Sequence, residues 1–288
     1  MRKLIGKLAR ARPAAAPPVE DAGPAQGKIA GPTSVGTSVI DVTGQTVYGD
    51  RALRFRSLTL REPDLSALET SPAIFAAFKI RLAKRTGARR DAGALLERRY
   101  GHRGYAVPLQ QPESNILTFI AYDEGQIVGT VGVALDGPQG LPADDIYNQE
   151  LDDLRGRGNR LCEFTRLAVD GTAASKPVLA GLFQTAYLYA ALIRGCTHAV
   201  IEINPRHVAF YQSSLRFESI GAQRMNRRVN APAVLLCASF DVISADLKRY
   251  AGKTVPPGVR RTLFHYGFAP TEESGVLMRL RELVAQSQ

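Results

Sequence analysis

Residues 161–169, Leu-Cys-Glu-Phe-Thr-Arg-Leu-Ala-Val, place an acid, a hydroxyl and a base inside an otherwise apolar stretch. The apolar and aromatic residues predict a central β-strand. Because side chains alternate along a strand, Glu163 and Thr165 are expected on one face and Arg166 on the other. A charge in a central strand is costly unless it is paired, and perturbed ionisation often marks function. Two interpretations stay open: a functional site, or a structural ion pair with a neighbouring element.

The segments around this strand alternate between strand and helix patterns. A β-hairpin is predicted upstream, because two β-rich runs flank the short turn 123–125. Strand, helix, strand, helix, strand in this order predicts a mixed α/β sheet with flanking helices. The expected strands are 53–58, 115–122, 126–135, 161–169, 199–203 and 233–240, and the expected helices are 144–155, 177–193 and 208–215, with two or three more in 65–100.

The two ends of the chain differ from this central domain, which we expect over 49–242. Residues 1–48 are rich in Ala, Pro and Gly, so they predict a flexible tail. Its basic start, with Leu4, Ile5 and Leu8, leaves a weak peripheral membrane contact open. Residues 243–288 predict a helical extension with breaks at Pro256, Pro257 and Pro270.

Composition narrows the class of protein. The net charge of +10 favours an anionic partner, and basic residues dominate between Lys79 and Arg103. A nucleic acid is not expected, because no nucleic-acid-binding motif accompanies the charge. The three cysteines lack paired spacing, which argues against a disulfide framework or a metal site and favours a reducing compartment. Without a secretory signal, and with 177–193 short for a membrane span, a cytoplasmic protein is expected.

A second candidate site follows the strand 199–203, at Asn204-Pro-Arg-His207 and Tyr211. His207 and Tyr211 are four residues apart, so they occupy one face of the predicted helix. That helix begins at the carboxyl end of the sheet, where open α/β sheets bind ligands. The alternative is a tyrosine that simply packs into the core.

Several motifs in this order resemble the N-acyl amino acid synthases of the FeeM type, distant relatives of acyl-homoserine-lactone synthases within the GNAT fold. The resemblance covers roughly residues 50 to 240. Its motifs are Ile127-Val-Gly-Thr130, Asp136-Gly-Pro-Gln-Gly-Leu-Pro-Ala143, Glu150 to Arg155, Leu161 to Asp170, Asn204-Pro-Arg-His207 with Phe210-Tyr211, and Val229 to Leu236.

The resemblance implies a GNAT-like twisted sheet of about seven strands, with the acyl thioester bound where two central strands part. Glu163, Thr165 and Arg166 match the Glu-x-Ser-Arg stretch of the lactone synthases, with Thr in place of Ser. Glu163 is then the expected base and Tyr211 the expected acid, both lining one pocket at the split. Backbone N–H groups of Leu167, Ala168 and Val169 would hold the oxyanion. Expected substrate contacts are Thr165, Arg166, Arg81, Asn204 and His207, with the two arginines as candidates for binding a carboxylate.

Two departures from related enzymes concern the substrates. The loop that follows Asp170 lacks the glycine spacing that binds the coenzyme A pyrophosphate in ordinary GNAT enzymes. An acyl carrier protein is therefore the expected donor, docked by Lys84, Arg85, Arg89 and Arg90 and presenting an acyl-phosphopantetheine thioester. The acidic residues that lactone synthases carry before the hairpin are missing, which argues against S-adenosylmethionine as the acceptor. No bound cofactor is expected.

The sequence thus predicts an N-acyltransferase that moves a long-chain fatty acyl group from acyl carrier protein to the amino group of an amino acid. Two alternatives stay open: a GNAT enzyme that uses acyl-CoA on another small amine, and a GNAT-like binding module without catalysis.

Overall fold

A computed structural model describes residues 46–48, 78–83, 92–96, 116–169, 175–255 and 262–286. Every element described below lies within residues 40–288. The expected strand 53–58, the docking residues Lys84, Arg85, Arg89 and Arg90, and most of the expected N-terminal tail lie outside the described residues.

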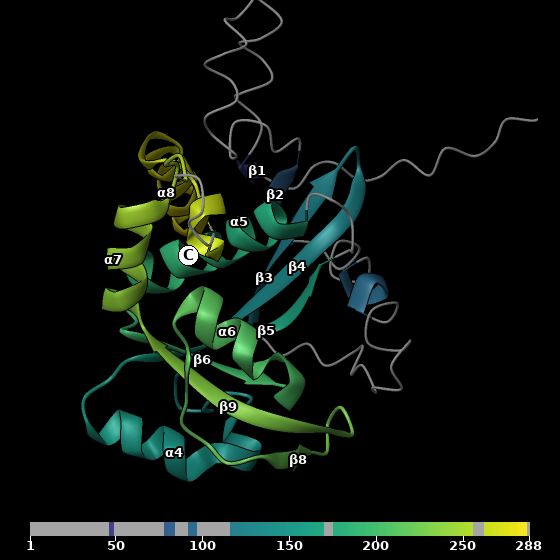
Figure 1. The fold of residues 1–288 in the computed structure, drawn as a ribbon, viewed down its shortest axis with the longest axis vertical. Helices are drawn as coiled ribbons and strands as arrows, with labels where there is room; N and C mark the ends of the chain where they lie inside the picture. The colour runs from purple at the N-terminus through teal and green to yellow at the C-terminus, as the bar shows by residue number, and fades with distance from the viewer. Residues whose placement is uncertain are drawn as a thin grey trace, which may run out of the picture. The chain divides into compact units, whose positions relative to one another are not determined.

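The described strands form a mixed sheet of nine strands in the order β1-β2-β3-β4-β5-β6-β9-β7, with β8 paired to β9 (Figure 1). Neighbouring strands are antiparallel except for β5 and β6, which run parallel at the centre. The strands are β1 (Thr46–Tyr48), β2 (Lys79–Leu82), β3 (Ile116–Asp123), β4 (Gln126–Leu135), β5 (Leu161–Val169), β6 (His198–Ile203), β7 (Glu218–Ser219), β8 (Arg224–Asn226) and β9 (Ala231–Ser239).

The predicted hairpin is confirmed as β3 and β4. Its two turn residues, Glu124 and Gly125, have φ angles of 44° and 81°. Positive φ at both central positions is the geometry of the tight turn that matches the right-handed twist of two paired strands. The hairpin forms the half of the sheet against which β5 pairs.

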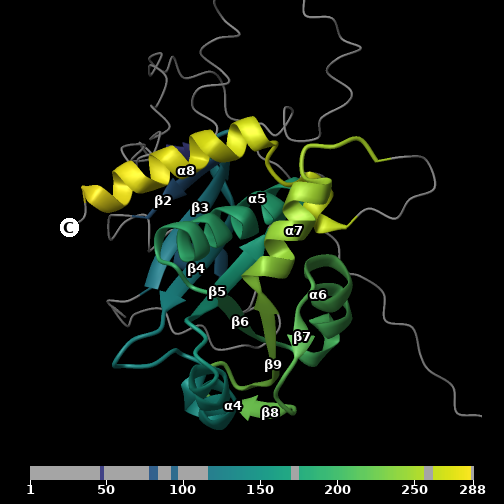
Figure 2. The same ribbon diagram turned by 90° about the vertical axis from the view of Figure 1, so that its left-hand side faces the viewer.

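Helices cover both faces of the sheet. One face carries α5 (Ser175–Tyr187), the π-helix η2 (Leu188–Ile193) and α6 (Val208–Leu215), whose apolar side chains share a core with Cys162 and Phe164 of β5. The other face carries α4 (Asp144–Gly156), which packs Tyr147 and Leu151 against Leu161. Figures 1 and 2 show α4 beside β8, apart from α5, α6 and α7. We call these the α5 face and the α4 face.

The C-terminal segment adds α7 (Phe240–Tyr250), the 3₁₀-helix η4 (Leu263–Tyr266) and α8 (Pro270–Ala285). Pro270 begins α8, since the first turn of a helix tolerates a residue without an N–H. Buried side chains of all three, such as Ile243, Phe264 and Leu280, belong to the same core as α5. The segment thus completes the α5 face, as Figure 2 shows.

Three features differ from the sequence-based expectations. Residues 79–82, expected within a helical region, form β2, because Ile80 and Leu82 alternate into the core while the strand pairs with β3. The strands β1, β7 and β8 have only two or three residues each, which left no alternating pattern to detect. They bring the sheet to nine strands instead of about seven.

The apolar segment 177–193 is confirmed as a buried helical segment, formed by α5 and η2. No helix within the described ranges is long and apolar enough to cross a bilayer.

Candidate functional site

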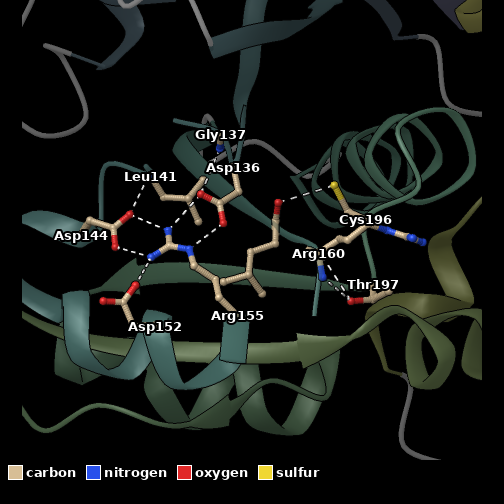
Figure 3. Close-up of polar contacts among 10 residues, drawn as sticks. Asp136, Gly137, Leu141, Asp144, Asp152, Arg155, Arg160, Cys196 and Thr197 are labelled. Carbon is tan, nitrogen blue, oxygen red and sulfur yellow. Dashed lines mark hydrogen bonds and ion pairs between the residues drawn. The ribbon is translucent and has the colours of Figure 1, made fainter. Parts of the chain in front are cut away.

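The two parallel strands at the centre of the sheet part after a short paired stretch. Leu161 pairs with His198, Cys162 with Ala199 and Glu163 with Val200, and within the described chain no pair follows. Just before this stretch, the residues that precede the two strands are also joined, because Arg160 donates its backbone N–H to the Thr197 hydroxyl at 3.0 Å (Figure 3). Residues 164–169 of β5 therefore have no partner in β6, and the predicted strand split is confirmed.

Beyond the split, β5 stays paired with β4 but changes register. Thr165 pairs with Gly132 and Ala168 with Thr130, so two residues of β5 face one of β4. Such a bulge twists the strand and re-aims its backbone groups. Arg166 sits in this bulge with a φ of 51°, in the left-handed region that non-glycine residues seldom occupy. The predicted oxyanion site therefore begins in the bulge, at Leu167, and continues with the backbone of Ala168 and Val169.

Glu163 is the last paired residue before the split, and only 2% of it is exposed. Its carboxylate accepts a hydrogen bond from the backbone N–H of Ala143 at 2.7 Å. Burial, followed by the nearby charge of Glu202, raises its pKa to about 8. A carboxyl group with a pKa near neutrality can accept a proton under physiological conditions and release it again.

A second carboxylate lies across the split. Glu202 follows Val200 by two residues on β6, so its side chain points to the α4 face as that of Glu163 does. The guanidinium of Arg228 donates to both Glu202 oxygens, at 3.1 and 3.2 Å, and Asn226 donates to one of them. The Arg228 guanidinium also forms an ion pair with the Asp145 carboxylate, at 3.3 Å. Burial raises the pKa of Glu202 in spite of these partners.

Glu202, Asn226 and Arg228 were missed by the sequence analysis. The signal for Glu202 was the same as for Glu163, an acid inside an apolar strand, at Ala199-Val-Ile-Glu-Ile203. Arg228 carried no comparable signal, because it reaches Glu202 from the turn between β8 and β9.

The loop that holds Glu163 is itself fixed by a cluster of ion pairs, shown in Figure 3. Arg155 of α4 contacts Asp136 and Asp144, each at 2.7 Å. Asp144 also accepts the backbone N–H of Leu141 at 2.6 Å. Gly140 has a φ of 70°, and a Cβ there would lie 2.6 Å from the Asp144 carboxylate. The cluster thus sets the position of Ala143, and through it the Glu163 carboxylate.

Tyr211 lies on the opposite face of the sheet. Its ring packs edge-on against Phe183 of α5 at 6.1 Å and against Phe217 at 6.0 Å between centroids. Both phenylalanines belong to the core of the α5 face, whereas Glu163 is held by the loop before α4. The two predicted catalytic side chains therefore lie on opposite faces of the sheet and not in one pocket.

An apolar cavity lies on the α5 face beside the split. Its wall includes Phe164, the residue that follows Glu163, together with Phe183, Tyr187, Leu215 and Phe217. Its volume is only about 20 Å³, room for about one water molecule, so the side chains around it are closely packed. Because Tyr211 packs on two of these side chains, its ring lies next to the cavity.

The remaining predicted substrate residues are spread more widely. Thr165 shares the α4 face with Glu163, as expected, since a Cβ on Gly132 would lie 3.2 Å from its methyl group. Arg81 is on β2, with its guanidinium over the Tyr122 ring at 5.7 Å. Three strand spacings of about 4.8 Å separate β2 from β5, which leaves the two backbones roughly 14 Å apart. The structure does not bring Arg81 to Glu163.

Asn204 and His207 lie where β6 leads into α6. The Asn204 side chain accepts the Arg206 backbone N–H at 3.2 Å and caps the short helix η3 (Pro205–His207). The Arg206 guanidinium donates to the His207 ring at 3.0 Å. In the ranges that the structure describes, no three His, Cys, Asp or Glu side chains form a metal site.

A mixed sheet whose two central parallel strands part next to a buried carboxylate is a GNAT-like fold, and the predicted fold class is confirmed. The chain belongs to the family of the N-acyl amino acid synthase FeeM, whose model matches residues 91–239. It is therefore an N-acyltransferase.

One solved structure agrees with this assignment, and two more distant ones are also similar to the chain. FeeM, an N-acyl amino acid synthase from uncultured soil microbes, is 32% identical, with a TM-score of 0.52 over 58% of this chain and 93% of its own. The AHL synthase LasI is 13% identical, with a TM-score of 0.42 over 57% and 90% of the two chains. A GNAT-family acetyltransferase from Streptococcus pneumoniae is 14% identical, with a TM-score of 0.39 over 56% and 98%. No protein of curated function matches the chain.

Proposed function

We propose that this N-acyltransferase moves a long-chain fatty acyl group from acyl carrier protein to the amino group of an amino acid. The observation that carries the proposal is Glu163, a buried carboxyl at the last pair of the parallel strands, with its pKa raised to about 8. A base at this position lies next to the point where β5 and β6 part, which is where we expect the thioester carbonyl to bind.

The amine approaches from the α4 face. Glu163 is buried there, the Glu202 side chain is 8% exposed, and Arg228 pairs with both Glu202 and Asp145. When both groups are ionised, their negative charge exceeds the positive charge that Arg228 supplies, so they attract an ammonium group. The amine must be neutral to attack, and Glu163 takes its proton. Arg166, in the bulge two residues beyond Phe164, remains the candidate for the carboxylate of the amino acid.

The acyl donor approaches from the α5 face. The side chains around the small cavity beside Phe164 are almost all apolar, which suits a fatty acyl chain, and they have to move apart to admit it. The amine nitrogen attacks the thioester carbonyl, the new C–N bond forms and the C–S bond breaks. Backbone N–H groups near the bulge hold the oxyanion, and Tyr211, next to the cavity, returns a proton to the thiolate.

The carrier protein is proposed from charge. The basic residues Lys84, Arg85, Arg89 and Arg90 would dock an acidic carrier, while the loop after Asp170 lacks the glycine spacing for a pyrophosphate. The donor is then a substrate, and the protein holds no cofactor of its own in this reaction.

The direct test is a reaction of the purified protein with palmitoyl carrier protein and a mixture of the protein amino acids. Mass spectrometry should find an N-palmitoyl amino acid that is absent with Glu163→Gln. A wild-type protein that forms an N-acyl amine other than an amino acid, or uses palmitoyl-CoA equally well, would replace the proposed acceptor or donor. A folded protein that forms no product with either donor would contradict the function as a whole.

A further inference from the structure

Two cysteines lie together where the parallel strands are still paired. Cys162 is on β5, one residue before Glu163, and Cys196 precedes β6. The Cys162 thiol contacts the His198 backbone carbonyl at 3.5 Å, and the Cys196 thiol contacts the Leu161 backbone carbonyl at 3.6 Å (Figure 3). Because Leu161 and His198 are the first pair of the two strands, both sulfur atoms lie at the same strand pair. The two thiols also hydrogen-bond to each other.

The surroundings of the two thiols differ. Cys162 is fully buried, and burial raises the pKa of its thiol. Cys196 is partly exposed, and the hydrogen bond from Cys162, followed by the charges of Arg194 and Arg160, lowers its pKa. The Arg160 guanidinium is fixed beside Cys196, because it donates to the Gly195 backbone carbonyl. A partly exposed thiol among arginines forms a thiolate more readily than a buried one, and the thiolate is the form that peroxides oxidise.

We propose that Cys196 and Cys162 form a disulfide when the protein meets hydrogen peroxide or an alkyl hydroperoxide, with Cys196 reacting first. The Cys196 thiolate attacks the O–O bond and becomes a sulfenic acid, and water or an alcohol leaves. The Cys162 sulfur then attacks the Cys196 sulfur. The S–S bond forms, the S–O bond breaks, and a second molecule leaves as water with the Cys162 proton. The two thiols together lose two electrons, and the peroxide gains them.

The third cysteine provides the matched control. Cys237 pairs with Val200 on β9 and belongs to the core of the α4 face, whereas Cys162 belongs to the core of the α5 face. Burial raises the pKa of Cys237 to about 12, so its thiol is also the less reactive form. Cys237 should therefore stay reduced while the other two thiols react.

The test treats the full chain with hydrogen peroxide, alkylates the remaining thiols in denaturant and maps the tryptic peptides. Trypsin places each cysteine in a separate peptide, namely 161–166, 195–206 and 229–248. Mass spectrometry should find the first two joined, with the mass of two hydrogen atoms missing, and the third alkylated at Cys237. A thiol reductant should separate the joined peptides.

Serine variants test the order of the two steps. Cys162→Ser should stop the reaction at the sulfenic acid of Cys196, which dimedone traps as an adduct. Cys196→Ser should slow the oxidation of Cys162 by about tenfold or more, because no exposed thiolate remains at this place. Cys237→Ser should form the disulfide as fast as the wild type. Circular dichroism verifies that each variant is folded.

A wild-type chain in which Cys162 and Cys196 both remain alkylatable, at peroxide doses that oxidise free glutathione, overturns the inference. A disulfide that includes Cys237 also overturns it. Dimedone added to the wild type at early times should label Cys196, and labelling of Cys162 first contradicts the proposed order. These measurements need no variant, so they decide the inference even where a serine variant does not fold.

Discussion

The backbone N–H of Ala143 donates to the Glu163 carboxylate at 2.7 Å, and it links the loop before α4 to the point where the central strands part. The bond stabilises the ionised form of a carboxyl group whose burial favours the neutral form. The pKa near 8 is the balance of these effects and of the nearby charge of Glu202, which also raises it.

Replacing Glu163 should remove most of the activity. Glu163→Gln keeps the shape and the contact with Ala143 but cannot take a proton, so turnover should fall on the order of a hundredfold or more. Glu150→Gln is the control, since Glu150 is also an acid of the α4 face, paired with Arg224 at 2.6 Å. Steady-state kinetics on both variants, with circular dichroism to verify folding, should separate them. Equal turnover in Glu163→Gln and the wild type rules out Glu163 as the base.

The free energy of unfolding should fall as the pH rises from about 4.5 to about 8, because the folded state keeps the Glu163 proton that the unfolded chain has lost. Urea titrations at several pH values measure this slope, and Glu163→Gln should lack the part due to Glu163. A variant with the same slope as the wild type shows that another group is responsible.

The catalytic pH profile should run in the opposite direction. The base works when ionised, so kcat/KM for the amine should rise with pH until about 8 and then level off. Two acceptor amines of different basicity separate the titration of the enzyme from that of the substrate. A midpoint that follows the amine alone would mean that Glu163 is already ionised at lower pH.

Glu202 should act on the binding of the amine. Glu202→Gln removes one of two carboxylates beside the ammonium, so KM for the amine should rise about tenfold or more, with a smaller change in kcat. The midpoint of the pH profile should also move to lower pH, because the charge of Glu202 raises the pKa of Glu163. A fall in kcat alone, with an unchanged midpoint, would indicate a structural role for Glu202.

The basic residues Arg85, Arg89 and Arg90 should govern the use of the carrier protein. Their joint change to Glu should raise KM for acyl carrier protein more than it lowers kcat, and leave acyl-pantetheine thioesters unaffected. The preference for the carrier should weaken with salt, since exposed charges are screened over roughly 8 Å at physiological ionic strength. Equal efficiency with acyl-CoA, or no response to the reversals, contradicts docking by charge.

Much of the fold was predictable from local patterns. Apolar and β-branched runs predict the strands β3, β4 and β5, and a glycine turn predicts the β3–β4 hairpin. These patterns depend only on residues that are close in sequence. The same pattern placed Glu163 and Thr165 on one face. Lys79–Leu82 could not be recognised as a strand, because four residues carry little periodicity and the strand exists through its pairing with β3.

The sequence by itself determined a mixed α/β sheet, a buried acid in its central strand and a tyrosine on the helix that follows β6. Only the tertiary structure decided which of these side chains are neighbours and on which face of the sheet each one lies. Glu202 and Arg228 come beside Glu163 from separate elements, and Tyr211 packs on the other face of the sheet. The physical reason is that side-chain alternation is a local property, whereas strand pairing, burial and the resulting pKa depend on contacts between segments far apart in the chain.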